Sequence, residues 1–313
     1  MKKFLTTSLI ASLLWIAPVQ RGVAQTSDNS TFFDNFESNS ASIDVLWYGQ
    51  NPTYNSEISE LAAAASSYDP WGDGSLDWNL TFWNPAEAAP TFSDYDVFVV
   101  GTGLAWSSGF SFDTSGILNN KSAIEAARGS RTFLSGQDAD LHYFINARNN
   151  QPFGFLANAV NWAGSGTGMG IVALPDGGRW WLNENSFLKN ELEGYVSYFV
   201  EENVVIPTET SDFPVNEGLT TAGLSNWQQS AHAGFNKNIP GYLSINDAGG
   251  SPGYAVTIVT ASEAAGGTLG SRKVPEPTSV FGLLAFFAVG VASSLQRNRR
   301  QASSRRSRWK IDG

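Results

Sequence analysis

Short apolar runs alternate with helix-favouring stretches through the middle of the chain. The runs that predict strands cover residues 43–49, 76–83, 96–101, 131–136, 170–175 and 255–260. Most are nearly continuous in apolar residues, which is typical of strands buried on both faces of a parallel sheet.

Four stretches between these runs favour helix: 55–65, 121–128, parts of 141–160, and 187–202. In the last of them the apolar residues recur at the spacing of an amphipathic helix. Alternation of strands and helices predicts an α/β domain over 43–260. We expect a doubly wound, mostly parallel sheet with helices on both faces.

The first 24 residues have the pattern of a secretory signal peptide. Lys2 and Lys3 precede an apolar stretch at 4–19, and the small residues 22–24 form a cleavage site. An uncleaved anchor helix is the alternative, but proline and polar residues interrupt the apolar stretch too early for it. We therefore expect 1–24 to be removed on export by Sec-type machinery.

Two further segments connect the predicted parts of the chain. Residues 25–42 are polar and predict a flexible segment before the α/β domain. Residues 261–273 are rich in glycine and alanine and predict a linker after it.

The C-terminal region contains a second apolar stretch. Residues 279–295 would span about 25 Å as a helix, enough for a single transmembrane pass. Arg297, Arg299 and Arg300 follow directly, and positive residues hold their end of a helix in the cytoplasm. This orientation leaves the α/β domain outside and 301–313 as a basic cytoplasmic tail.

Pro275, Glu276 and Pro277 stand immediately before this stretch. Triplet, apolar helix and arginine cluster together resemble, over 274–300, the PEP-CTERM sorting signal of Gram-negative bacteria. The resemblance implies recognition by an exosortase, removal of the tail, and a mature domain on the cell surface or outside the cell. Family members usually stop soon after the arginines, whereas this chain continues to Gly313. An ordinary single-pass anchor is the alternative.

Charge is distributed unevenly along the chain. The formal net charge of −10 combines +3 in 1–24, −20 in 25–271 and +7 in 272–313. An acidic exported domain repels nucleic-acid phosphates, so we expect no nucleic-acid partner. The chain has no cysteine, which excludes disulfides, cysteine-ligated metals and cysteine nucleophiles.

The strand ends at 48–49 and 100–103, with the segment 132–138, resemble the flavodoxin-like layout of class I glutamine-amidotransferase-like proteins, including ThuA-like relatives. The resemblance implies a ligand site at the carboxyl ends of the strands. Glutaminase activity is excluded because the nucleophilic cysteine is missing.

The densest polar group lies at one of these strand ends. Asp138, Asp140 and His142 follow the predicted strand 131–136, and the only other histidine is His232. If the two histidines meet, these four residues form a mixed site for acid–base chemistry or a divalent cation. The alternative is that both aspartates cap the next helix and each histidine makes a local hydrogen bond.

Two weaker patterns point to other chemistry. Ser230 lies two residues before His232, a loose serine–histidine pair. Trp180 and Trp181 beside Arg179 could stack on a sugar, or could belong to the core.

Two functions agree with these observations. The first is an envelope or extracellular-polysaccharide binding or structural protein that uses an aromatic and acidic surface. The second is a hydrolase-like or metal-dependent enzyme with Asp138, Asp140, His142 and His232 in one cleft. No organic cofactor is predicted, and the expected partners are the export machinery, an exosortase and the membrane.

Overall fold

A computed structural model describes residues 42–49, 52–70, 75–102, 112–145, 151–174 and 180–261. All of them belong to one compact unit, which begins at Ser40. The expected signal peptide, the sorting signal and nearly all of the expected linker lie outside the described residues. In the part that is described, no helix has both the length and the apolar character needed to cross a membrane.

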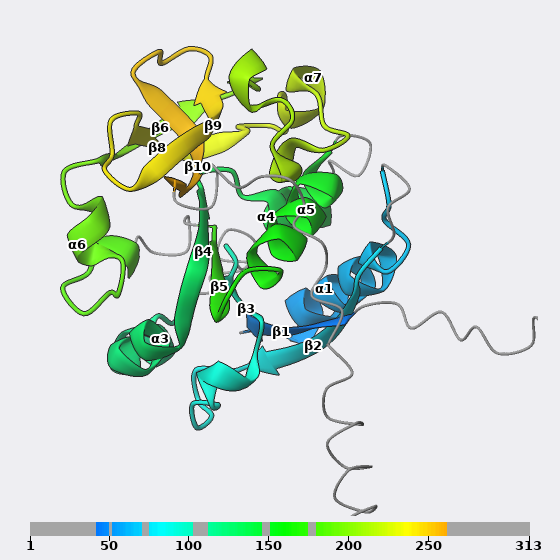
Figure 1. Cartoon of the computed structure of the whole chain (residues 1–313), viewed down its shortest axis with the longest axis vertical. Coiled ribbons are helices and arrows are strands. Elements are labelled where there is room, and N and C mark those ends of the chain that lie inside the picture. The colour runs from blue at the N-terminus through cyan, green and yellow to red at the C-terminus, as the bar shows by residue number, and fades with distance from the viewer. Residues whose placement is uncertain are drawn as a thin grey trace, which may run out of the picture. The chain divides into compact units, whose positions relative to one another are not determined.

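Half of the sheet is parallel. Its strands lie side by side in the order β2, β1, β3, β5, β4 (Figure 1). Their bounds are β1 Ser42–Tyr48, β2 Asp77–Trp83, β3 Val97–Val100, β4 Arg128–Ser135 and β5 Met169–Ala173. Strands β3 and β5 are entirely buried, β1 is buried over most of its length, and β4 is buried in its second half.

The other half of the sheet is antiparallel. Strand β10 lies against β4 and is followed across the sheet by β8 and β6, while β9 pairs with β10 and β7. Their bounds are β6 Val196–Glu201, β7 Val204–Val205, β8 Ala231–Asn236, β9 Tyr242–Ala248 and β10 Tyr254–Thr260. These strands complete a 10-stranded mixed sheet.

Helices cover both faces of this sheet (Figure 1). One face packs against α1 Pro52–Ala65, α4 Ala139–Ile145, α5 Pro152–Gly164 and α7 Thr221–Leu224. The other packs against α2 Ser115–Asn119, α3 Lys121–Ala127 and α6 Lys189–Leu192. Strand β1 shows the alternation, since Val45 and Trp47 face the first set of helices and Leu46 and Tyr48 the second.

The predicted α/β class, with parallel strands and helices on both faces, is confirmed. The strand order differs from the flavodoxin-like order 2-1-3-4-5, because β5 lies between β3 and β4. The predicted helix 187–202 is wrong beyond its first turn. Gly194 takes a positive φ of 81°, which ends the helix, and the β-branched and aromatic residues after it pair as β6 with β8.

The tryptophans of the described residues belong to the core. All seven of them are at most 9% exposed: Trp47, Trp78, Trp83, Trp162, Trp180, Trp181 and Trp227. The indole N–H of Trp181 donates to the hydroxyl of Tyr198 at 2.9 Å. The sugar-stacking prediction for Trp180 and Trp181 is therefore wrong, because burying these large apolar rings stabilises the fold more than leaving them in water.

The end of β4 lies unusually close to the antiparallel half of the sheet. Gly136 donates its N–H to the carbonyl of Val256 at 2.7 Å and accepts from the N–H of His232 at 2.8 Å. A Cβ at this position would lie 1.9 Å from the carbonyl oxygen of Ala233. Only glycine fits, and its backbone fixes β8 beside the segment that follows β4.

We predict that Gly136→Ala lowers the free energy of unfolding by at least about 2 kcal/mol, since a Cβ must displace backbone and not a flexible side chain. Urea unfolding at pH 7 measures the change. Gly253→Ala is the matched control, because a Cβ there meets nothing within 4 Å. Equal stability of the two variants would contradict the prediction.

Candidate metal centre

The first two residues of the centre come from the junction of β4 and α4. Asp138 precedes the helix directly, and its carbonyl accepts the N–H of His142 at 2.9 Å, the first hydrogen bond of the helical turn. This turn places both side chains at the carboxyl end of β4. In parallel sheets, ligands bind at that end of the strands.

The third residue arrives from the antiparallel half. His232 is the second residue of β8, and its bond to Gly136 brings it beside Asp138. Nε2 of His232 lies 3.4 Å from Oδ2 of Asp138. Asp138 and His232 are 94 residues apart in the chain, and the hydrogen bond between His232 and Gly136 brings them together.

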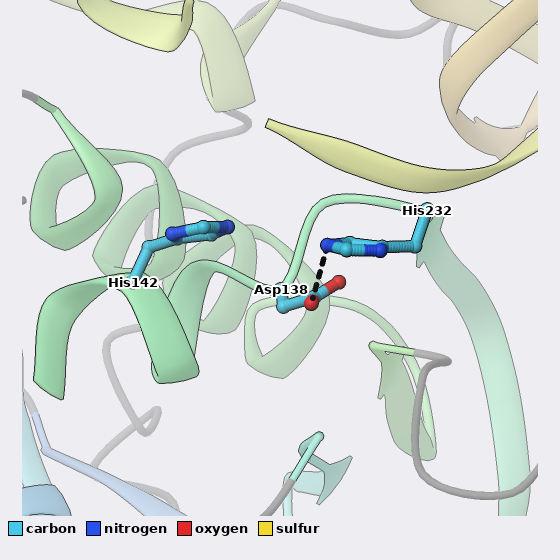
Figure 2. A group of neighbouring side chains, drawn as sticks. All are labelled: Asp138, His142 and His232. Atoms are coloured by element: carbon cyan, nitrogen blue, oxygen red, sulfur yellow. Dashed lines mark ion pairs between the residues drawn. The ribbon is translucent and has the colours of Figure 1, made fainter. Parts of the chain in front are cut away.

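Asp138, His142 and His232 form a compact group of potential metal ligands. One ligand atom from each lies within 4.8 Å of the others. In Figure 2 the two imidazoles approach each other from α4 and β8, with the Asp138 carboxylate between them. Asp138 and His142 are buried, whereas the His232 side chain is 15% exposed.

His142 is held in its neutral form. The pKa of its imidazole is lowered to about 4, mainly by burial and also by the neighbouring His232, against the opposing effects of the Gln229 carbonyl and Glu202. Its Nε2 lies 3.1 Å from the carbonyl oxygen of Gln229. Its Nδ1 is buried and has no hydrogen-bond partner among the described residues. Because a carbonyl oxygen only accepts, Nε2 of the neutral ring carries the proton, and the lone pair that metal ligation requires is on Nδ1.

Asp140 has a different environment. Its Oδ2 accepts hydrogen bonds from the N–H of Thr102 at 2.7 Å and from the hydroxyl of Tyr54. Burial raises the pKa of this carboxyl, and these hydrogen bonds oppose the rise. Asp140 therefore connects α4 to β3 and α1 and stands outside the three-residue group.

The turn before β8 completes the surroundings of the centre. Asn226, Gln228 and Gln229 all have positive φ angles, of 62°, 62° and 71°. Residues other than glycine rarely adopt a positive φ. Those that do are concentrated at functional sites. The ring of Trp227 packs on that of His142, with centroids 5.5 Å apart.

Ser230 is part of the structure of this turn. Its hydroxyl accepts from the N–H of Trp227 at 2.9 Å and donates to the carbonyl of Glu202 at 3.2 Å. Because the buried hydroxyl is hydrogen-bonded to backbone groups, the prediction that Ser230 and His232 act as nucleophile and base is wrong.

The turn could not be predicted from the sequence. Of its three residues with positive φ, only Asn226 is of a type that favours this conformation.

The donor set has a definite chemical preference. Two imidazoles and one carboxylate suit Zn²⁺ and similar transition ions, whereas Ca²⁺ and Mg²⁺ take mainly oxygen ligands. Ligand atoms around a tetrahedral zinc ion lie about 3.3 Å apart. The ligand atoms of the three residues lie within 4.8 Å of one another, so small shifts of their side chains would bring them to this spacing. The three residues could hold a metal ion and leave one position open.

Comparisons with protein-family models, with curated proteins and with solved structures gave no match to this chain. A function for this protein is therefore inferred from the geometry of Asp138, His142 and His232.

We predict that the metal-free protein loses stability in acid through His142. The unfolded chain takes up a proton near pH 6.5, while folded His142 does so only near pH 4. Between these values the unfolded state binds more protons, so the free energy of unfolding falls by up to about 3 kcal/mol as the pH falls. Denaturant unfolding in the presence of a chelator measures this change.

His142→Gln is the control for this measurement, because it removes the titrating imidazole and leaves the carboxylates that also titrate in acid. Its stability should fall less steeply over the same range. Identical slopes for the two proteins would refute the assignment.

Proposed function

We propose that the protein is an exported metalloprotein whose α/β domain binds one divalent transition-metal ion and acts as a metal-dependent, hydrolase-like enzyme. The observation that carries the proposal is the convergence of Asp138, His142 and His232 within 4.8 Å. The two histidines are the only ones in the chain, and they come from different halves of the sheet.

The burial of the group agrees with a cation site. Asp138 is fully buried, and its Oδ2 lies 3.4 Å from Nε2 of His232. His142 stays neutral near pH 7, because its pKa is lowered to about 4. A neutral imidazole and a carboxylate side by side are ligands that a divalent transition-metal ion accepts.

Hydrolytic chemistry follows from the number of protein ligands. Structural zinc sites are closed by four protein ligands, whereas catalytic sites have three and leave a position for water or substrate. A metal ion in such a site lowers the pKa of its bound water and polarises a carbonyl or phosphoryl oxygen. His232 is the partly exposed member of the group, with 15% of its side chain accessible.

The binding role expected from an aromatic surface has less support. Every tryptophan of the described residues is buried, so these rings are not available to stack on a polysaccharide. The acidic character of 25–271 remains its only support.

We expect the purified full-length chain, kept in detergent, to bind one zinc ion. Asp138→Asn, His142→Ala and His232→Ala should each reduce the zinc content to well below one ion per chain, because a three-ligand site does not survive loss of a ligand. Elemental analysis after dialysis against trace zinc measures the stoichiometry.

Asp140→Asn is the matched control, because it makes the same change two residues along and keeps an oxygen to accept from Thr102 and Tyr54. It should retain zinc. A wild-type chain without zinc, or equal loss in Asp140→Asn and Asp138→Asn, would reject the proposed site.

We further propose that the chain is sorted to the cell surface by an exosortase. The support is the order of Pro275, Glu276 and Pro277, the apolar stretch 279–295 and the arginine cluster Arg297, Arg299 and Arg300. The expected route is export through Sec-type machinery, an intermediate held in the inner membrane by the C-terminal helix, and a mature domain at the surface.

Replacing Pro275, Glu276 and Pro277 with alanine should block tail removal in a host that has an exosortase. Mass spectrometry of the exported protein should then show the retained tail. Alanines at 271–273, directly before the recognition region, are the control and should be processed normally. A mature mass that is the same with and without the triplet would contradict exosortase sorting.

A further inference from the structure

Glu202 holds the turn before β8 at three points. It follows β6 directly, and its carbonyl accepts from the N–H of Asn226 at 3.0 Å and from the hydroxyl of Ser230 at 3.2 Å. Its carboxylate Oε1 accepts from the N–H of Gln229 at 2.8 Å. Bonds from an N–H to a charged acceptor are stronger than neutral ones, so Glu202 is the main anchor of this turn.

The same turn touches the metal centre. The carbonyl oxygen of Gln229 lies 3.1 Å from Nε2 of His142, and the ring of Trp227 packs against the His142 ring. The chain then continues directly into β8 and His232. The turn therefore restrains His142 by direct contact, and the chain after it carries His232.

This turn needs an external restraint because its own conformation is unfavourable. Three of its residues, Asn226, Gln228 and Gln229, lack the freedom of glycine and yet have positive φ. Each is less favourable than ordinary backbone and persists only where other contacts impose it. The Glu202 carboxylate holds the peptide before Gln229 through its N–H, and the peptide after Gln229 carries the carbonyl that reaches His142. Without this carboxylate, the backbone of Gln229 is less restrained and its carbonyl can move away from His142.

We propose that Glu202 is a positioning residue of the metal centre, acting through Gln229 and Trp227 to fix His142 and the approach of His232. The inference rests on the proposed function. Groups that orient metal ligands from outside the ligand set typically change metal affinity 10- to 100-fold. The negative charge of Glu202 also reaches His142, where it would favour a bound cation.

The test compares zinc affinity in full-length variants by competition with a chromophoric chelator. Glu202→Ala should lower the affinity at least about 10-fold. Glu202→Gln should restore it to within about threefold of wild type, because the amide oxygen can still accept from Gln229. Rescue by glutamine separates positioning from a general loss of structure.

Glu201→Ala is the matched control. The Glu201 carboxylate is buried and accepts from the N–H groups of Glu202, Asn203 and Gly250, with none from the turn. Removing this carboxylate should lower the unfolding temperature of the metal-free protein and leave the zinc affinity within about threefold of the wild-type value. Circular dichroism confirms folding, and if Glu202→Ala does not fold, Glu202→Asp replaces it, with an expected loss of at least about threefold.

Wild-type affinity in Glu202→Ala, an equal loss in Glu201→Ala, or a loss that Glu202→Gln does not rescue would each overturn the positioning role. A wild-type chain that binds no zinc would instead overturn the proposed function. The two failures are therefore distinguishable in one series of measurements.

Discussion

The backbone contact at Gly136 is the constraint on which the rest of the structure depends. One residue without a side chain bonds to Val256 on β10 and to His232 on β8. The contact extends the pairing of β4 with β10, which joins the parallel half of the sheet to the antiparallel half, and it brings a residue of β8 to the carboxyl end of β4. Any other residue would place a Cβ inside the backbone of β8. The candidate metal centre is therefore assembled next to the place where the two halves of the sheet meet.

Asp138 and Asp140 lie two residues apart near this contact and have different roles. Oδ2 of Asp140 accepts from Thr102, just after β3, and from Tyr54 on α1, and so holds α4 against both. Asp138, equally buried, lies beside two imidazoles, and its Oδ2 is 3.4 Å from Nε2 of His232. Both could have been helix caps by residue type, and their environments separate them. The candidate centre therefore combines a carboxylate, a neutral histidine and a partly exposed histidine, residue types that could hold a transition-metal ion.

The unfavourable backbone of the turn 225–230 agrees with this interpretation. Three positive φ angles in neighbouring non-glycine residues persist only where other contacts impose them. Here the contacts come from Glu202 on one side and His142 on the other. The turn transmits restraint from the edge of β6 to the centre, so the antiparallel half contributes both a ligand and part of its support.

The sequence by itself determined the α/β class, the positions of the parallel strands and the residues worth testing. Apolar runs identify buried strands because burial depends mainly on local composition. The sequence did not predict β6 from 187–202 or the order of β4 and β5, and it left open whether Trp180 and Trp181 belong to the core. All of these depend on which distant segment each one meets. Only the tertiary structure decided that His142 and His232 meet and that Asp138, not Asp140, joins them. Those choices rest on a close approach of two backbones at Gly136 and on hydrogen bonds between residues far apart in the chain, which no local pattern encodes.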